Sequence, residues 1–367
     1  MDYLIPILII IVLVSLGFFY PKSKIVHILL VFMSFSLYAL SYDDYDRLVY
    51  MDHYDRVSTS IGSEYEILYV WIMSLCNYLG LSFQEFRYVT AVITLGGLEY
   101  AAIKLSPQKN QVWALYLIYS SCFDATLIRA SLSMGLIAIY IVRLINSKTK
   151  KDYLLCSIWV IAASLIHSSS WAYCSFIPLW IFLKNRSNMT KFLCIFLIVV
   201  GFVFVGSSII FTVYGNLPVR EYTLEKYTSA DSGSLGDVIY NIIKYCFIIS
   251  PAVIFGRSGS FKIKDVQDFD KSILGLNLLF MILLIPQYYT SLFSRLFKVL
   301  IFFNYIFLTR HPWQQSRSAK KPLLIVFSLL YAIIMFSFHI YNSPLSLIFV
   351  VDMHVKTNEI LNFSFFY

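Results

Sequence analysis

The sequence predicts an all-α, polytopic integral membrane protein with about 12 transmembrane helices and one interfacial helix on the outer face. Hydrophobic residues make up 59% of the 367 residues and charged residues only 14%, whereas soluble domains carry about 25% charged residues. The basic residues also stand in short groups between apolar segments, as the positive-inside rule expects of cytoplasmic loops. We therefore expect a single polytopic membrane domain over residues 1–367.

The apolar segments define the expected helices, because about 20 apolar residues cross a hydrocarbon core of about 30 Å. The first segment follows an acidic Met-Asp pair and has no small-residue cleavage site, which indicates a retained helix and not a signal peptide. The predicted spans are residues 3–20, 25–41, 86–104, 111–128, 129–145, 153–167, 170–184, 192–213, 238–256, 272–288, 291–309 and 322–341.

Five basic groups determine the expected topology. If they are cytoplasmic, both ends of the chain and the polar loops 42–66 and 214–237 lie outside. The net charge of +8 then comes from basic residues in cytoplasmic loops, and we expect no nucleic-acid partner. The groups are Lys22 and Lys24; Lys148, Lys150 and Lys151; Lys184, Arg186 and Lys191; Arg257, Lys262 and Lys264; Arg310, Arg317, Lys320 and Lys321.

Residues 64–79 are apolar enough for one more span, but counting them as a span would place the Lys148–Lys151 group outside. As a helix they would be only about 24 Å long, at a rise of about 1.5 Å per residue. Two glutamates, Glu64 and Glu66, also open the segment. We therefore predict an interfacial helix that lies on the outer face of the membrane.

The sequence carries no signature of a metal, disulfide or cofactor site. Its six cysteines stand singly in apolar runs, without a Cys-x-x-Cys or Cys/His cluster. It also lacks the P-loop, dinucleotide-binding, zinc-protease and nucleophile-elbow motifs. We therefore expect no metal and no cofactor, and we expect the energy for any reaction to come with the substrate.

The polar stretch Tyr42–Glu66 contains seven acidic residues. If it is helical, Asp46, Tyr50 and Tyr54 lie on one face, because residues four apart are neighbours on a helix. A carboxylate beside aromatic rings at a membrane surface suits an enzyme that acts on a lipid-linked sugar. A solvated loop with a few ion pairs is the alternative interpretation. The acids are Asp43, Asp44, Asp46, Asp52, Asp55, Glu64 and Glu66.

Arg129 lies in an apolar segment, near its expected outer end and shortly after Asp124. An arginine at the centre of a membrane helix costs about 2.5–3.5 kcal/mol on insertion scales, so such residues tend to have partners. One interpretation is a guanidinium that binds pyrophosphate through paired hydrogen bonds. The other is a side chain that reaches the outer headgroups or pairs with Asp124.

Five further residues lie at or near the expected outer face. Arg295 stands near the outer start of a late span, with Lys298 one turn further on, and Arg220 and Lys226 lie in the 214–237 loop. His167 ends a span, and a lone histidine in such a place serves either as a hydrogen-bonded structural residue or as a base. Together the basic residues favour an anionic ligand that approaches from outside.

Several short motifs follow one another along the first half of the chain. They are D-x-x-x-Y-x-x-x-[YF] at Asp46, Tyr50 and Tyr54; E-x-x-Y at Glu66 and Tyr69; I-R-x-S-L-[AS] at 128–133; and [LI]-[FI]-H-x-S at 165–169. In this order and spacing the chain resembles the EpsG family of Wzy-type polysaccharide polymerases over about residues 40–180, and its early loop is also similar to C-type glycosyltransferases. Ala130 departs from the family pattern, which usually has Gln there, and so does the tail from Asn342 onward.

The resemblance implies a glycosyltransferase in the bacterial inner membrane, with its active site facing the periplasm or outside. It would transfer a growing O-antigen, capsule or exopolysaccharide chain from undecaprenyl pyrophosphate to the next lipid-linked repeat unit. Asp46 is the first candidate for the base that activates the acceptor hydroxyl and Asp43 the second, while Glu66 would orient the acceptor. Its partners would be the lipid-linked oligosaccharide and the bilayer; whether a chain-length regulator binds stays open.

The remaining candidate residues would hold the substrate. Tyr50 and Tyr54 would stack on a sugar ring. Arg and Lys stabilise the pyrophosphate leaving group best, and the basic candidates are Arg129, Arg295, Arg220 and Lys226, with His167 beside them.

Two other functional classes remain as alternatives. A transporter or flippase of lipid-linked oligosaccharides would show internal repeats and broken helices near the midplane, and neither is evident. A membrane O-acyltransferase would need a deeply embedded catalytic histidine. His167 lies near the expected outer edge and His339 near the end of the chain, so neither meets this requirement well.

Overall fold

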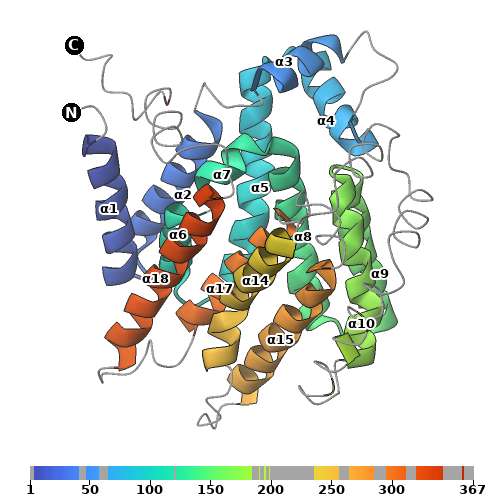
Figure 1. The fold of residues 1–367 in the computed structure, drawn as a ribbon. Coiled ribbons are helices and arrows are strands. Elements are labelled where there is room, and N and C mark those ends of the chain that lie inside the picture. The colour runs from blue at the N-terminus through green and yellow to red at the C-terminus, as the bar shows by residue number, and fades with distance from the viewer. Residues whose placement is uncertain are drawn as a thin grey trace. The chain divides into compact units, whose positions relative to one another are not determined.

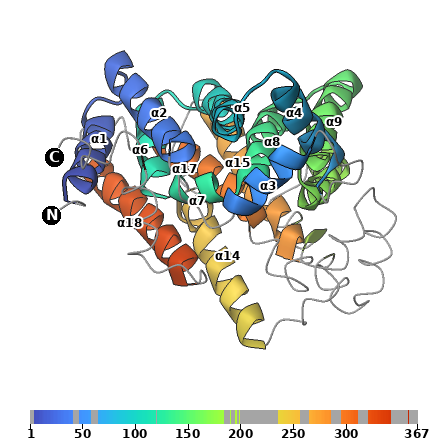
Figure 2. The ribbon, with the colours of Figure 1, turned by 90° about the horizontal axis from the view of Figure 1, so that it is seen from above.

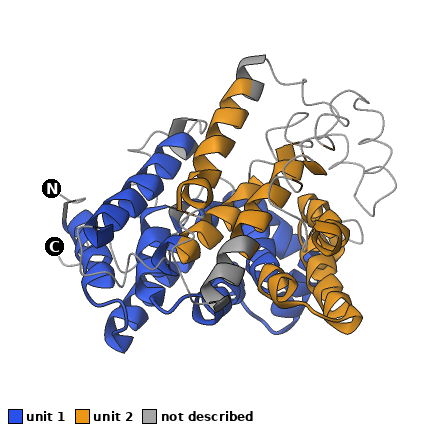
Figure 3. Cartoon of the chain, turned by 90° about the horizontal axis from the view of Figure 1, so that it is seen from below, with its two compact units in different colours: residues 1–63, 69–139, 308–367 blue, residues 64–68, 140–307 orange. Residues whose placement is uncertain are grey.

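The computed structural model describes residues 4–40, 47–57, 65–119, 121–183, 190, 194–195, 198, 235–255, 264–284, 295–310, 320–341 and 358. Within these ranges the helices account for the regular structure, as the sequence predicts. The chain divides into two compact units (Figure 3). Unit 1 contains Met1–Ser63, Tyr69–Ile139 and Leu308–Tyr367, and unit 2 contains Glu64–Leu68 and Tyr140–Phe307. The single membrane domain over 1–367 stays a prediction.

Unit 1 is built around α6, which packs against α1, α2 and α18 (Figures 1 and 2). α2 also packs against α5 and α7, and α3 against α5. The helices α4 (Ile67–Tyr78) and α8 (Ile128–Asn146) contribute residues to both units. The other helices of unit 1 are α1 (Leu4–Phe19), α2 (Lys24–Ala39), α3 (Arg47–Arg56), α5 (Phe83–Leu105), α6 (Lys109–Ile118), α7 (Ser121–Thr126) and α18 (Lys320–Tyr341).

A half-buried carboxylate joins three helices of unit 1. Glu99 of α5 accepts a hydrogen bond from the Trp113 indole of α6, with 2.6 Å between Nε1 and Oε2. Its other oxygen lies 2.7 Å from His27 Nε2 of α2 and 3.7 Å from Lys109 Nζ. Because a polar group in an apolar environment is costly unless it is bonded, these contacts make Glu99 a link between α2, α5 and α6.

Two glycines bring α5 and α8 into backbone contact in unit 1. A Cβ atom added to Gly97 would lie 2.1 Å from the carbonyl oxygen of Gly135. Small residues at such a position let membrane helices approach closely and gain packing contacts along their backbones. Gly96, one residue earlier, has no atom within 4 Å of its added Cβ.

Unit 2 has an aromatic core and a polar centre. The rings of Tyr173, Phe176, Phe280 and Phe297 pack together, with centroids 5.1–6.2 Å apart. Its helices are α9 (Lys150–Ser164), the 3₁₀ helix η1 (Ser168–Ser175), α10 (Phe176–Leu183), α14 (Leu235–Phe255), α15 (Lys264–Phe280), the 3₁₀ helix η2 (Met281–Leu283) and α17 (Phe297–Arg310), of which the residues up to Phe307 belong to this unit.

The polar centre of unit 2 connects three helices through amide side chains. Asn277 of α15 donates to Asn304 Oδ1 of α17 at 2.9 Å, and Asn304 Nδ2 donates to the Ile248 carbonyl of α14 at 2.6 Å. The Tyr245 hydroxyl of α14 donates to the Asn277 carbonyl. Each polar group thus finds a partner inside the protein, as a chain in a membrane requires.

Several predicted spans agree with the observed helices. Among the described residues, three helices are long and apolar enough to cross a membrane: Phe83–Leu105, Ile128–Asn146 and Lys320–Phe338. They coincide with the spans expected at 86–104, 129–145 and 322–341. The count of about 12 spans stays a prediction, because other apolar helices are shorter and the 192–213 span lies almost entirely outside the described residues.

Other segments differ in detail from the prediction. The span expected at 111–128 is two helices, α6 and α7, because the backbone at Tyr119 is extended, with φ −138° and ψ 139°. The segment predicted at 170–184 begins as the 3₁₀ helix η1 and continues as α10. The segment expected to be interfacial is helical as α4, and its position on the outer face stays a prediction.

Replacing Gly97 by alanine should destabilise unit 1 far more than replacing Gly96. The added Cβ of Gly97→Ala would overlap the backbone of α8, so we expect the free energy of unfolding to fall by about 1–3 kcal/mol or more. Gly96→Ala has open space and a better helix former, so its stability should stay equal or rise. Thermal unfolding of both purified variants in detergent measures the difference. Equal midpoints would contradict the close approach of α5 and α8.

Candidate active site

The predicted site residues that the structure describes belong to both units. Tyr50, Tyr54 and Arg129 lie in unit 1, and His167 and Arg295 lie in unit 2. Glu66 is also in unit 2, in the short segment before α4. Asp43, Asp46, Arg220 and Lys226 are outside the described residues, as is nearly all of the predicted outer loop 214–237.

Tyr54 connects α3 to the start of α5 in unit 1. Its hydroxyl donates to the Leu81 carbonyl at 2.7 Å, and its ring packs against Phe83 and Phe86, with centroids 5.9 and 5.1 Å apart. Burial raises the pKa of Tyr54 to about 12, so the phenol stays a neutral donor. Only 1% of the residue is exposed. Tyr54 therefore positions α3, and its contact with a sugar stays a prediction.

Tyr50 lies on the same helix, four residues before Tyr54. Its ring meets Tyr69 of α4 edge to face, with centroids 6.4 Å apart, and 7% of the residue is exposed. The helix α3 begins at Arg47, directly after Asp46 in the sequence, so both tyrosines lie within its first eight residues. The D-x-x-x-Y-x-x-x-Y pattern therefore includes two residues that anchor α3 to the helices α4 and α5.

The beginning of α5 is fixed by a capping box. The Ser82 hydroxyl accepts from the Glu85 backbone N–H, and Glu85 Oε2 accepts from the Ser82 N–H at 2.7 Å. Both bonds are of the kind that an ionised carboxylate and a hydroxyl oxygen accept. The cap directly follows Leu81, which accepts the Tyr54 hydrogen bond. The turn between α4 and α5 is thus held at both sides.

Glu66 and His167 are brought together in unit 2. The Glu66 carboxylate accepts a hydrogen bond from the Ser168 backbone N–H at 2.8 Å, and the Leu68 N–H donates to the Leu165 carbonyl at 2.9 Å. Glu66 is 6% exposed and His167 9% exposed. The sequence identified the two residues in separate motifs, and the structure makes their segments direct neighbours.

His167 has a defined hydrogen-bond partner. Its Nδ1 lies 2.7 Å from the Ser169 hydroxyl oxygen. A hydroxyl that donates to Nδ1 leaves the ring proton on Nε2, which makes that nitrogen a donor. His167 is extended, with φ −146° and ψ 114°, and it directly precedes η1. The change of backbone direction at this residue carries the Ser168 N–H to Glu66.

The same 3₁₀ helix also reaches the segment of Arg295. Tyr173 of η1 donates from its hydroxyl to the Leu296 carbonyl at 2.6 Å, and it accepts at its own carbonyl from the Tyr140 hydroxyl at 3.0 Å. Arg295 is half-buried and stands at the start of the turn that leads into α17. Therefore η1 links the Glu66 and His167 segment to the Arg295 segment within unit 2.

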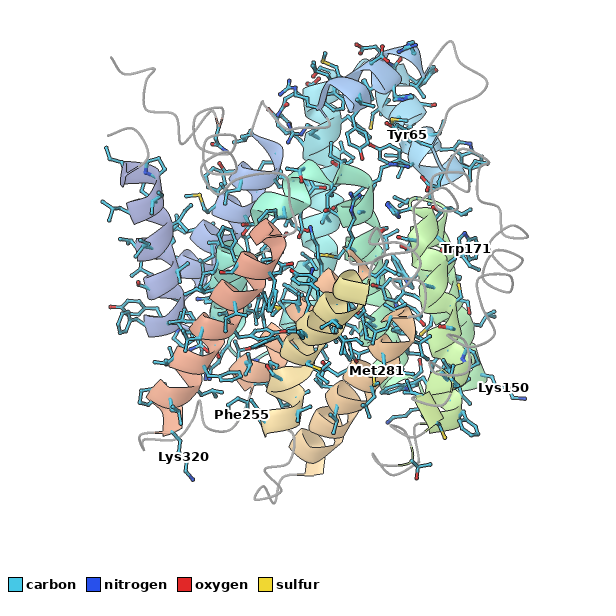
Figure 4. All side chains as sticks on the ribbon, viewed as in Figure 1. Tyr65, Lys150, Trp171, Phe255, Met281 and Lys320 are labelled. Atoms are coloured by element: carbon cyan, nitrogen blue, oxygen red, sulfur yellow. The ribbon has the colours of Figure 1, made fainter. Side chains whose placement is uncertain are left out.

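The Glu66 and His167 segment lies away from the basic end of unit 2. Figure 4 shows Tyr65, which directly precedes Glu66 in the sequence, far from Lys150 and Phe255, while Trp171 lies between Tyr65 and Lys150. Lys150 begins α9, and Phe255 ends α14 shortly before the next basic group in the sequence. Within this unit, the candidate site and the residues expected to be cytoplasmic thus stand at opposite ends.

Arg129 lies in the first turn of α8, directly after the break between α7 and α8. The break is held by Asp124, whose carboxylate accepts from the Tyr116 hydroxyl at 2.9 Å and whose backbone carbonyl accepts from the Ser131 hydroxyl at 2.7 Å. Asp124 is fully buried, and Arg129 is half-buried. The acid near Arg129 therefore has a structural role in fixing the start of α8.

Sequence reasoning missed two ionisable residues in apolar helices. Lys244 of α14 is 6% exposed, and Glu99 of α5 is the carboxylate that joins three helices. The signal for both was available, because a charged residue inside an apolar span is unusual and tends to have a function or a partner. Among the described residues no group of three His, Cys, Asp or Glu side chains is placed to hold a metal ion.

Replacing Glu66 tests its structural role. Glu66→Ala leaves the buried Ser168 N–H without its acceptor, so we expect a loss of about 1–3 kcal/mol in the free energy of unfolding. Glu66→Gln keeps an amide oxygen for this bond and should lose less. Thermal unfolding of both variants checks this, and an unchanged midpoint for Glu66→Ala would contradict it.

Comparison with known proteins identifies a family. The model of the EpsG family matches residues 24–350, which is most of the chain. No curated protein and no solved structure matches the chain.

Proposed function

Because the chain belongs to the EpsG family of Wzy-type polymerases, we propose that it extends a cell-surface polysaccharide on a lipid carrier. The family and the apolar helices indicate a membrane protein of polysaccharide biosynthesis. In this proposal the donor is a growing glycan on undecaprenyl pyrophosphate, and the acceptor is the next lipid-linked repeat unit. The reaction takes place at the outer, periplasmic face of the bacterial inner membrane.

The family match over residues 24–350 is the observation that carries this proposal. The hydrogen bond between Glu66 and the Ser168 N–H supports it, because it joins two of the motifs on which the resemblance was based. The location of these motifs at the end of unit 2 opposite Lys150 supports an outer site, since Lys150 belongs to a predicted cytoplasmic group (Figure 4).

The proposed reaction is one displacement at a sugar carbon. A carboxylate takes the proton of the acceptor hydroxyl, whose oxygen forms a bond to the anomeric carbon of the donor. The bond between that carbon and the pyrophosphate oxygen breaks, and undecaprenyl pyrophosphate leaves with the electron pair. Asp46 is the proposed base, with Asp43 as the second candidate, and Glu66 orients the acceptor.

The leaving group gains negative charge during this step, so cations that bind it accelerate the reaction. Arg129 is the first proposed ligand, because a guanidinium can donate two parallel hydrogen bonds to a phosphate. Arg295, Arg220 and Lys226 are further proposed ligands. A His167 ring with its proton on Nε2 would offer one more donor to a sugar or phosphate oxygen.

Replacing Arg129 tests the role of the guanidinium. Arg129→Lys should lose most activity, because a lysine provides a point charge and not a planar pair of donors. Arg129→Ala should be expressed normally and leave cells with single, unpolymerised repeat units. Gel analysis of the cellular glycans measures both results. Full-length polymer from Arg129→Ala would restrict Arg129 to a structural role.

Replacing Asp46 tests the proposed base. Asp46→Asn has nearly the same shape, so the variant should fold and insert normally but lose a factor of about 10²–10⁴ in rate. Substrate binding should persist. The assay is turnover of a lipid-linked repeat unit by the purified protein.

Two matched variants of the same stretch complete this test. Asp44→Asn removes the same charge from a residue outside the Asp46, Tyr50 and Tyr54 face, and it should be close to wild type. An active Asp46→Asn beside an inactive Asp43→Asn would move the base to Asp43. Normal turnover by all three variants would remove this stretch from the chemistry.

A further inference from the structure

Unit 2 contains two buried lysines on different helices. Lys244, about halfway along α14, is 6% exposed, and Lys298, in the first turn of α17, is 5% exposed. Lysine is almost never buried to this extent unless its charge is compensated. Both helices are otherwise rich in apolar residues, so the surroundings do not solvate an ammonium group.

The two lysines lie in the same layer of the unit. Tyr245, next to Lys244, packs its ring edge-on against Phe297, next to Lys298, with centroids 5.5 Å apart. The bond from Asn304 to the Ile248 carbonyl, at 2.6 Å, holds α14 and α17 together further along both helices. Lys244 and Lys298 thus each stand one residue from a ring contact between α14 and α17, which places two buried cations in the same region of the unit.

The described carboxylates of unit 2 do not compensate Lys244. Its ammonium makes no ion pair or hydrogen bond within the part of the chain that the structure describes. Glu66 accepts from the Ser168 N–H, and Asp152 accepts from the N–H groups of Lys148 and Thr149 at the start of α9. Lys244 thus carries a buried charge next to a second cation.

We propose that Lys244 and Lys298 form an anion site that binds the diphosphate group of a membrane lipid. Two like charges buried together are unfavourable alone and become favourable when an anion of at least equal charge lies between them. Half-buried Arg295, one turn before Lys298, extends the site with a third cation. A diphosphate has enough charge and acceptor oxygens to bind all three.

The surface of α14 favours a lipid as the source of this diphosphate. The side chains of Ile242, Ile243 and Phe247 are 49%, 45% and 40% exposed, directly beside Lys244 in the sequence. An apolar chain can lie along this face while its charged head reaches the buried lysines. This inference rests on the proposed function, because the lipid-linked substrates of a polymerase carry such a group.

Binding of farnesyl diphosphate and of inorganic pyrophosphate tests the site. The full-length protein is placed in phosphatidylcholine nanodiscs, and calorimetry gives the dissociation constants. Lys244→Met and Lys298→Met should weaken both ligands by about 10- to 100-fold, the usual effect of losing one charged hydrogen bond. Lys244→Arg keeps the charge and should stay within a few-fold of wild type. Lys151→Gln, which removes an exposed charge from the same unit, is the control and should bind like wild type.

Thermal unfolding distinguishes this site from a purely structural role. Lys244→Met removes a buried charge, so its ligand-free midpoint should equal or exceed that of wild type, and farnesyl diphosphate should no longer raise it. A lower ligand-free midpoint with an unchanged shift would overturn the proposal. So would wild-type affinity in Lys244→Met, or loss of binding when the nanodiscs contain phosphatidylglycerol, since the site would then accept any anionic headgroup.

Comparison of the two ligands identifies the source of the anion. Tighter binding of farnesyl diphosphate than of inorganic pyrophosphate supports a lipid, and equal binding overturns that part of the proposal. The test needs no turnover, so it is separate from the polymerase assay. If the wild-type protein binds farnesyl diphosphate but makes no polymer, the proposed function is wrong and the diphosphate site stands. If Lys244→Met polymerises normally and still binds farnesyl diphosphate like wild type, the proposed site is wrong and the proposed function stands.

Discussion

The structure depends on one constraint: polar groups inside apolar helices must find their partners within the protein. Where the described helices meet, such pairs are present. Glu99 is bonded to Trp113 and lies beside His27 in unit 1, and Asn277 is bonded to Asn304 in unit 2. These bonds specify which helices are neighbours, because apolar contacts alone would fit many arrangements.

The same constraint accounts for the hydrogen bonds at the candidate site. The Ser168 N–H stands at the start of η1, where the helix offers it no carbonyl, and Glu66 supplies the acceptor. The Tyr173 hydroxyl donates to the Leu296 carbonyl, near the turn that leads into α17. One short 3₁₀ helix therefore positions an acid, a histidine and an arginine that come from distant parts of the chain. Lys244 makes no such pair within the described residues, and this is informative because lysine carries a full charge.

Hydropathy predicted much of the fold but not its breaks. The helix expected at 86–104 is α5, Phe83–Leu105, and it starts earlier because the polar side chains of Ser82 and Glu85 cap it. The interruption at Tyr119 could not be predicted, because the residues on both sides of it are apolar and a hydropathy window averages over it. Periodicity correctly placed Tyr50 and Tyr54 on one helix, α3.

The sequence was a weaker guide to the site, because the contacts that build it are long-range. Spacing along the chain showed that Tyr54 follows Tyr50 by one turn, but not that Phe83 and Phe86 would cover its ring. It also identified Glu66 and His167 one by one, and their neighbourhood arises only when the start of α4 meets the end of α9. Lys244 could have been noticed as a charge inside an apolar span, but its proximity to a cation on another helix could not be read from spacing along the chain.

The Glu99 contacts also have a consequence for how the chain is assembled during translation. Membrane segments emerge in order, so His27 is already made when Glu99 leaves the ribosome, while Trp113 and Lys109 follow it. A carboxylate that enters the bilayer without a partner has an unfavourable free energy of insertion, and a partner on an earlier helix makes that free energy less unfavourable. His27 would thus be the first residue to bind Glu99 when α5 inserts, and Trp113 and Lys109 of α6 would add their contacts afterwards. The order of residues in the gene then matches the order in which the charge needs its partners.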